Sequence, residues 1–233
     1  MNKLLLGICL VFISSILNAQ SMPYSRKRVK KKQLKALSVM QINQLQNGAL
    51  LVRLHTKAPS IDALRKQGNE NKANKIERKQ KEFNLAVRQA FLNHFDFCPT
   101  YFFYSEQSVA VRNKQFENVD FLNDSLQPDK SIIFSSSSFL TAEFGAIEQD
   151  TNTYFKDYHY VAGAEGLERR TSYYGGPTMG FGALVIKSDI FIQLCKPFPY
   201  YVRTFDSFIV KRRPKTVVKK MNKKLRKYNN HVV

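Results

Sequence analysis

The stretch CPTYFFYS, residues 98–105, is a short apolar run between a long helical pattern and a polar turn. Its length, its aromatic side chains and the proline near its start are typical of a buried strand. A second run of this kind, GALLVRL at residues 48–54, precedes the helical pattern. Strand, helix and strand in this order predict a parallel pair joined by a right-handed crossover.

Further elements follow on both sides of this unit. The helical pattern at residues 61–95 is interrupted at Gly68 and Asn69, which predicts two helices or one kinked helix. Residues 34–45 have the leucine spacing of a short lead-in helix. The expected strands after residue 105 are 119–122 as the third parallel strand, 132–134 and 139–145, the hairpin 182–186 with 190–194, and an edge segment at 197–202.

We therefore predict an α/β fold whose mixed sheet has a parallel βαβαβ first half, a C-terminal hairpin and a closing basic helix. The order resembles a thioredoxin-like order with a large insertion, although the chain contains no CxxC motif. The insertion at residues 148–177 is rich in tyrosine and has no regular period, so it is predicted to be irregular.

Residues 1–19 have the features of a secretory signal peptide. Lys3 precedes an apolar run at residues 4–16, and the small residue Ala19 stands at the expected cleavage position. The run is too short to span a bilayer comfortably, and an uncleaved anchor is the alternative. We expect an exported protein of the periplasm, the outer-membrane surface or the medium, with no transmembrane helix after cleavage.

Cleavage would leave two cysteines, Cys98 and Cys195, in an oxidising compartment. A disulfide between them is one prediction. Both cysteines lie in strongly apolar runs, where buried free thiols are also common, so that alternative stays open.

The positive charge of the chain is concentrated at its two ends. The formal net charge is +19, and residues 26–35 and 211–227 carry basic side chains without any acidic one. Setting these two runs and Lys3 aside leaves the body at 36–206 close to neutral. We divide the chain into a basic tail at 20–35, a single domain at 36–206 and a basic C-terminal helix at 207–233. The predicted anion-binding residues are Arg26, Lys27, Arg28, Lys30, Lys31, Lys32, Lys211, Arg212, Arg213, Lys219, Lys220, Lys223 and Lys224.

Runs of like charge often bind polyanions, and anionic lipid and acidic polysaccharide are the polyanions that an exported protein meets. Val217, Met221 and Leu225 recur at helical spacing within the second run, which predicts an amphipathic helix. Its narrow apolar stripe could lie on a membrane surface or dock on the domain. A merely solvated tail is the third possibility. Specific nucleic-acid recognition is not expected, because few aromatic residues accompany the basic ones.

No motif specifies a reaction, a metal or a cofactor. The four histidines lack metal-ligand spacing, and the glycine-rich loop at 175–182 lacks the lysine of a phosphate-binding loop. In open parallel sheets, ligands bind beyond the carboxyl ends of the strands. That rule selects a candidate ligand site of Tyr104, Ser105, Asn123 and Asp124, to which the insertion adds His159. The tyrosines of the insertion could cover a sugar or peptide bound there. The alternative is that these are cap and turn residues.

The segments GALLVRL at 48–54, CPTYFFYS at 98–105, FLNDSLQPD at 121–129 and PFPYYVR at 197–203 resemble a family of uncharacterised exported proteins of Gram-negative bacteria. The resemblance implies export but no activity. The sequence thus predicts a cell-envelope protein that engages anionic lipid or polysaccharide through its basic ends. An envelope hydrolase with its site at the strand ends, under the tyrosine-rich loop, is the alternative, so enzymatic activity is left open.

Overall fold

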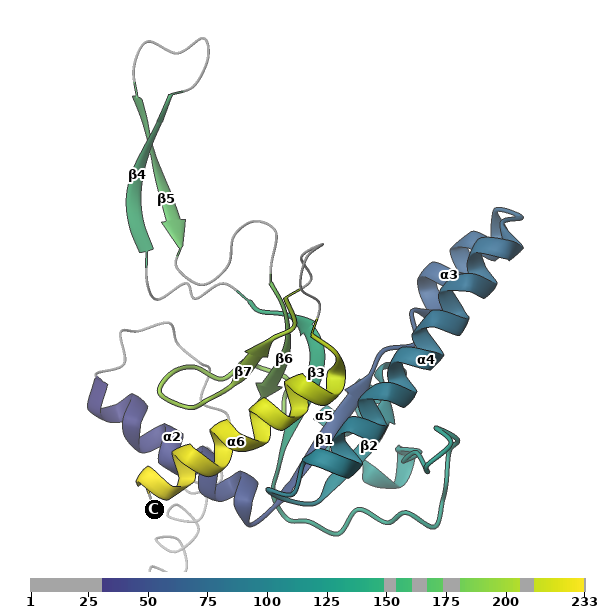
Figure 1. Cartoon of the computed structure of the whole chain (residues 1–233), viewed down its shortest axis with the longest axis horizontal. Helices are drawn as coiled ribbons and strands as arrows, with labels where there is room; N and C mark the ends of the chain where they lie inside the picture. Colours follow the sequence, from purple (N-terminus) through teal and green to yellow (C-terminus); the bar gives the residue numbers. More distant parts are fainter. Residues whose placement is uncertain (1–30, 149–153, 161–166, 174–180, 206–211, 233) are drawn as a thin grey trace, which may run out of the picture. The chain divides into compact units, whose positions relative to one another are not determined.

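Five strands form one mixed sheet in the order β2-β1-β3-β6-β7 (Figure 1). The computed structural model describes residues 31–148, 154–160, 167–173, 181–205 and 212–232. The strands of the sheet are β1 (Ala49–Leu54), β2 (Thr100–Tyr104), β3 (Phe139–Ala146), β6 (Gly182–Lys187) and β7 (Tyr201–Arg203).

The central strand β1 runs parallel to both of its neighbours. Val52 stands opposite Phe102 of β2 on one side and Ala142 of β3 on the other. Strand β6 is antiparallel to β3, and β7 is antiparallel to β6. The predicted α/β class, with a parallel first half, a C-terminal antiparallel pair and a closing helix, is confirmed.

Helices cover the sheet on both faces. They are α2 (Lys31–Gln46), α3 (Ala58–Lys66), α4 (Glu70–His94), α5 (Ser108–Arg112) and α6 (Pro214–Val232), with short 3-10 turns at Ser105–Gln107 and Phe116–Asn118. The interruption between α3 and α4 falls at Gly68, whose φ of +71° is strained for any residue with a side chain. None of the helices in the described part of the chain is long and apolar enough to cross a membrane.

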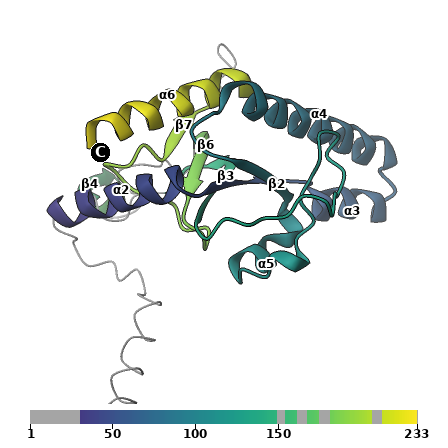
Figure 2. The ribbon, with the colours of Figure 1, turned by 90° about the horizontal axis from the view of Figure 1, so that it is seen from below.

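The alternation of side chains along β1 creates two hydrophobic cores. Leu50, Val52 and Leu54 pack against α2, α4 and α6, whereas Ala49 and Leu51 pack on the opposite face with Val111 of α5. Figure 2 shows α4 and α6 on one side of the sheet and α5 on the other. Both faces of the central strands are therefore buried, which explains why their sequences are continuously apolar.

Helix α6 docks its apolar stripe on the first core. Val217, Val218, Met221 and Leu225 have no exposed surface. The helix is also fixed at its sides, because the Tyr228 and Ser38 hydroxyls share a hydrogen bond of 2.5 Å and Arg226 pairs with Asp96 of the α4 C-terminal end at 2.8 Å. Of the possibilities for this helix, docking on the domain is the one observed.

Three of the predicted strands do not form, at residues 119–122, 132–134 and 190–194, and residues 132–134 belong to no strand. Residues 119–122 do not form the third parallel strand; their backbone runs beside β2, where the Leu122 N–H donates to the Phe102 carbonyl at 2.9 Å, and only an isolated bridge joins Leu122 to Pro128. Strand β3 takes the third place instead, on the other side of β1. On the side of β6 away from β3, the antiparallel partner is β7, while residues 190–194 contribute only the bridge between Lys187 and Gln193.

The tyrosine-rich insertion is more regular than predicted. It contains β4 (Tyr154–Tyr160) and β5 (Leu167–Tyr173), which pair antiparallel in a sheet of their own. Asp157 stands opposite Arg170 in this pair, and Lys156 stands opposite Thr171. The sequence did not predict these strands, because neither has the alternation of apolar and polar residues that marks a half-buried strand, and residues 168–172 are all polar.

Candidate functional site

A cleft of about 1010 Å³ lies at the edge of the sheet where β1, β2 and β3 end. Its walls come from the residues after β1, from the middle of α4, from Ser105 and Glu106 after β2, and from the start of α6. The ends of parallel strands are the usual place for ligand binding in such sheets. The position predicted for a ligand site therefore coincides with a cleft.

The predicted ligand residues are not all brought to this cleft. Ser105 lines it, and its hydroxyl donates to Glu106 at 3.3 Å. The Tyr104 hydroxyl instead donates to the Leu126 carbonyl at 2.9 Å, beside the first core. Asn123 accepts the N–H groups of Ser125 and Gln127 within its own turn. For Tyr104 and Asn123, the alternative of cap and turn residues describes the contacts better.

Asp124 also lies apart from the lining. The exposed Asp124 carboxylate pairs with the buried Arg88 guanidinium of α4 at 2.5 Å. Its role is thus to neutralise a buried charge. His159 belongs to β4, and its side chain lies outside the described residues.

A buried carboxylate organises the charges behind the cleft. Glu143 of β3 is 7% exposed and contacts three basic side chains, Lys187 at 2.9 Å, Arg53 at 3.0 Å and His55 at 3.5 Å. Lys187 also reaches Glu148 at 3.0 Å. The sequence signal for this network was the presence of single charged residues inside apolar strands, because a buried charge needs a partner.

These contacts set the pKa of Glu143. Burial alone would raise it, but the hydrogen bonds from His55 and Lys187 and the charges of Lys187 and Arg53 outweigh burial and lower the pKa to about 2. The pKa of Lys187 shifts in the opposite direction. Burial would lower its pKa, and the contacts with Glu143 and Glu148 raise it instead.

The stability of the protein should therefore fall on acidification through this carboxylate. Because the pKa of Glu143 is below its ordinary value of 4.5, its contribution is complete above about pH 4.5 and is lost as the pH falls toward 2. The contribution is roughly 2 to 3 kcal/mol. Urea unfolding of the protein and of Glu143→Gln at several pH values measures it. The difference in unfolding free energy between the two should shrink from pH 5 to pH 2; a constant difference would contradict the assignment.

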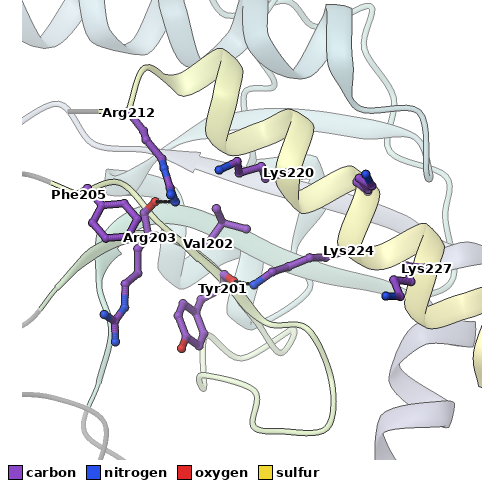
Figure 3. A pocket seen from close by; sticks show the side chains of 9 residues that line it. Tyr201, Val202, Arg203, Phe205, Arg212, Lys220, Lys224 and Lys227 are labelled. Carbon is purple, nitrogen blue, oxygen red and sulfur yellow. Dashed lines mark hydrogen bonds between the residues drawn. The ribbon is translucent and has the colours of Figure 1, made fainter. Parts of the chain in front are cut away.

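A second depression, the basic groove, lies between α6 and β7 (Figure 3). Its volume is about 440 Å³. The residues that line it are Tyr201, Val202, Arg203, Phe205, Arg212, Lys220, Lys223, Lys224 and Lys227. Six of these nine side chains are basic and none is acidic, so the groove is a local concentration of positive charge.

Contacts within the basic groove hold its cations in place. Arg212 donates to the Arg203 carbonyl at 3.2 Å, and its guanidinium lies 4.0 Å from the centre of the Phe205 ring (Figure 3). Lys224 donates to the Tyr201 carbonyl at 3.0 Å. Stacked guanidinium groups lose little freedom when an anion binds.

The pKa of Lys224 reflects the positive charge of the basic groove. Partial burial of its ammonium lowers its pKa, and the charges of Lys196, Arg212 and Lys220 lower it further. The neighbouring cations thus repel one another. An anion bound among them would relieve that repulsion.

The structure distributes the predicted anion-binding residues unevenly. Arg212, Lys220, Lys223 and Lys224 line the basic groove, and Arg213 lines the cleft. Lys219 is exposed on α6, and Lys31 and Lys32 belong to the first turn of α2. The predictions for Arg26, Lys27, Arg28, Lys30 and Lys211 lie outside the described residues.

Sequence reasoning missed two basic residues of the groove. Arg203 comes from the edge strand β7, and Lys227 belongs to the C-terminal basic run. Lys227 could have been found from its helical spacing to Lys220, Lys223 and Lys224. Arg203 could not, because nothing in the local sequence places β7 beside α6.

Cys98 and Cys195 are not joined to each other by a disulfide, so the structure has the unbridged one of the two alternatives. Cys98 packs against the first core at the start of β2, and burial raises the pKa of its thiol to about 12 although a hydrogen bond from the Leu50 backbone opposes the shift. A thiol with so high a pKa is unreactive.

Among the described residues of the cleft, no serine or cysteine is in contact with a histidine. Ser105 donates to Glu106, and His55 lies against Glu143. Among the described residues, no three His, Cys, Asp or Glu side chains gather closely enough to hold a metal ion.

Comparison with family models, with curated proteins and with solved structures gives no match. The resemblance to exported Gram-negative proteins and the thioredoxin-like analogy therefore stay predictions. The function has to be argued from the cleft and the basic groove themselves.

Proposed function

We propose that this protein is an exported binding protein whose basic groove holds an acidic polysaccharide of the cell envelope. The observation that supports the proposal most directly is the set of six basic side chains between α6 and β7, with no acidic one among the described residues that line the groove. Partial burial lowers the pKa of Lys224, and the nearby charges of Lys196, Arg212 and Lys220 lower it further, so positive charges gather closely at this point of the groove.

The position of α6 favours a polymer over a membrane surface. A helix that binds a bilayer from the interface inserts its apolar face among the lipids. The apolar stripe of α6 is instead buried in the first core, and only its basic side is open. The groove offers aromatic rings beside the cations, at Tyr201 and Phe205, and this combination suits a chain of charged sugar rings.

Reversing three charges of the basic groove tests the proposal. The variant Lys220→Glu, Lys223→Glu, Lys224→Glu should bind polygalacturonate at least about tenfold more weakly than the unaltered protein, because attraction is replaced by repulsion. Deletion of α6 is not a suitable test of binding, because it would expose the hydrophobic core to water. The measurement is a calorimetric titration at several salt concentrations, in which the affinity of the unaltered protein should fall as salt rises.

The matched control carries the same three reversals on another helix. Lys72, Lys75 and Lys81 are exposed on α4 and do not line the groove. The variant Lys72→Glu, Lys75→Glu, Lys81→Glu should keep most of its affinity for the polymer. Equal losses in the two variants would mean that net charge, and not the groove, attracts the polymer, and would refute the proposal.

An anionic lipid surface is the second candidate. The basic run at residues 26–32 supports it, because clustered lysines and arginines are attracted to anionic head groups. Vesicles that contain phosphatidylglycerol, used in place of the polymer with the same two variants, distinguish the candidates. Tighter binding to vesicles than to polygalacturonate would favour the lipid.

A further inference from the structure

The cleft at the strand ends has an apolar inner wall. Leu54, Val87 and Ala183 line it and are buried, and Phe83 and Phe144 line it with partly exposed rings that meet edge to face at 5.6 Å. Apolar surface left open in a concave site is stabilised when an apolar group covers it.

Two polar side chains of that wall, Gln80 and Asn84, already bond to other groups of the protein. The buried Gln80 donates to Asn84 at 3.0 Å, and Asn84 donates to the His55 carbonyl at 2.9 Å. A sugar in the cleft would find few open partners there, which argues against the sugar expected for this position. The inner wall selects an apolar group instead.

The rim of the cleft is basic. Lys57, Lys79 and Arg213 line it and are exposed, and no carboxylate among the described residues forms an ion pair with them. Glu106, the one acidic residue among the described residues of the lining, already accepts hydrogen bonds from Thr56 and Ser105. The rim therefore attracts an anion, while the wall behind it attracts a chain.

We infer that the cleft binds a single-chain anionic amphiphile, with its head group at Lys57, Lys79 and Arg213 and its alkyl chain against Phe83 and Phe144. The head group is a carboxylate or a phosphate, since both are anions that lysine and arginine bind. The volume of about 1010 Å³ is at the upper end of the range for small-ligand sites, which leaves room for a chain. This site is separate from the basic groove, although Arg212 contributes to the lining of both.

The test is a calorimetric titration of the purified protein with laurate and with dodecyl phosphate, both below their micelle concentrations. At least one of them should bind at least about tenfold more tightly than dodecyl maltoside, which has the chain without the charge, and than butyrate, which has the charge with a short chain. The better of the two anions identifies the head group. Binding of both no tighter than dodecyl maltoside or butyrate would overturn the inference.

Two variants locate the site, each with a matched control. Phe83→Glu puts a carboxylate in the inner wall and should weaken binding at least about tenfold, while Leu92→Glu on the same helix, where Leu92 is 52% exposed, should not. The double variant Lys57→Glu, Lys79→Glu should weaken binding severalfold, while Lys72→Glu, Lys75→Glu should not. Thermal unfolding checks that each variant is folded, and equal affinities in variants and controls would overturn the inference.

The groove variant separates this site from the proposed function. Lys220→Glu, Lys223→Glu, Lys224→Glu should lose polygalacturonate and keep its affinity for the amphiphile within about twofold, because these lysines do not line the cleft. Loss of the amphiphile in this variant alone would assign the binding to the groove and overturn the inference. If neither the groove variant nor its control Lys72→Glu, Lys75→Glu, Lys81→Glu loses affinity for polygalacturonate, the proposed function is refuted. The inference about the cleft is then unaffected.

Discussion

Replacing Glu143 by alanine should lower the free energy of unfolding by about 3 kcal/mol. The carboxylate contacts Lys187 and Arg53, whose side chains are 11% and 26% exposed, and its removal leaves these partly buried cations without their main partner. The Nε atom of Arg53 is already buried without a hydrogen-bond partner. Lys187 keeps Glu148 at 3.0 Å, which holds the expected loss at the lower end of the range for broken buried ion pairs. Chemical denaturation at pH 7 measures the change.

The control is Glu82→Ala. Glu82 forms an exposed pair with Arg78 at 3.9 Å, and such a pair contributes at most a few tenths of a kcal/mol. The triple variant Arg53→Met, Glu143→Leu, Lys187→Met removes all three charges together and should recover much of the loss. A cost of less than about 1 kcal/mol for Glu143→Ala would show that water reaches the cations freely.

Replacing Leu225 by alanine should lower the free energy of unfolding by about 2 to 5 kcal/mol. The side chain has no exposed surface and packs in the first core beside Met221. Its truncation removes buried apolar area and leaves a cavity between α6 and the sheet. Chemical denaturation and the midpoint of thermal unfolding both report the change.

Leu92→Ala is the matched control, because Leu92 is a helical leucine that is 52% exposed. It should change the free energy of unfolding by less than about 1 kcal/mol. Similar costs for the two variants would indicate that α6 is not docked in solution, and the argument against insertion of its stripe into a bilayer would then fail.

Much of the fold could be predicted because its central elements follow local patterns. A few consecutive residues are enough to identify β1 and β2 as buried strands and α6 as a helix with one buried face. The third parallel strand could not be chosen in this way. Residues 119–122 and 139–146 are both apolar, and which of them lies beside β1 is decided by contacts between distant segments.

The candidate sites also differ in how far local sequence patterns predict them. The position of the cleft follows from the parallel order of the strands, a rule that needs no distant contact. The basic groove requires β7 to lie against α6, so Arg203 could not be assigned to it in advance. Asp124 was selected because it follows a predicted strand, yet its carboxylate pairs with the buried guanidinium of Arg88 on α4.

Strand β7 ends the sheet, and all three of its residues pair with β6. An open edge offers backbone groups to which a second chain can add a strand, which is a common start of aggregation. Here Lys224 occupies the Tyr201 carbonyl, and the charged side of α6 borders the same edge. Lys224 therefore leaves one carbonyl fewer for a second chain to pair with, and the positive charge along this edge disfavours pairing between two copies of the protein.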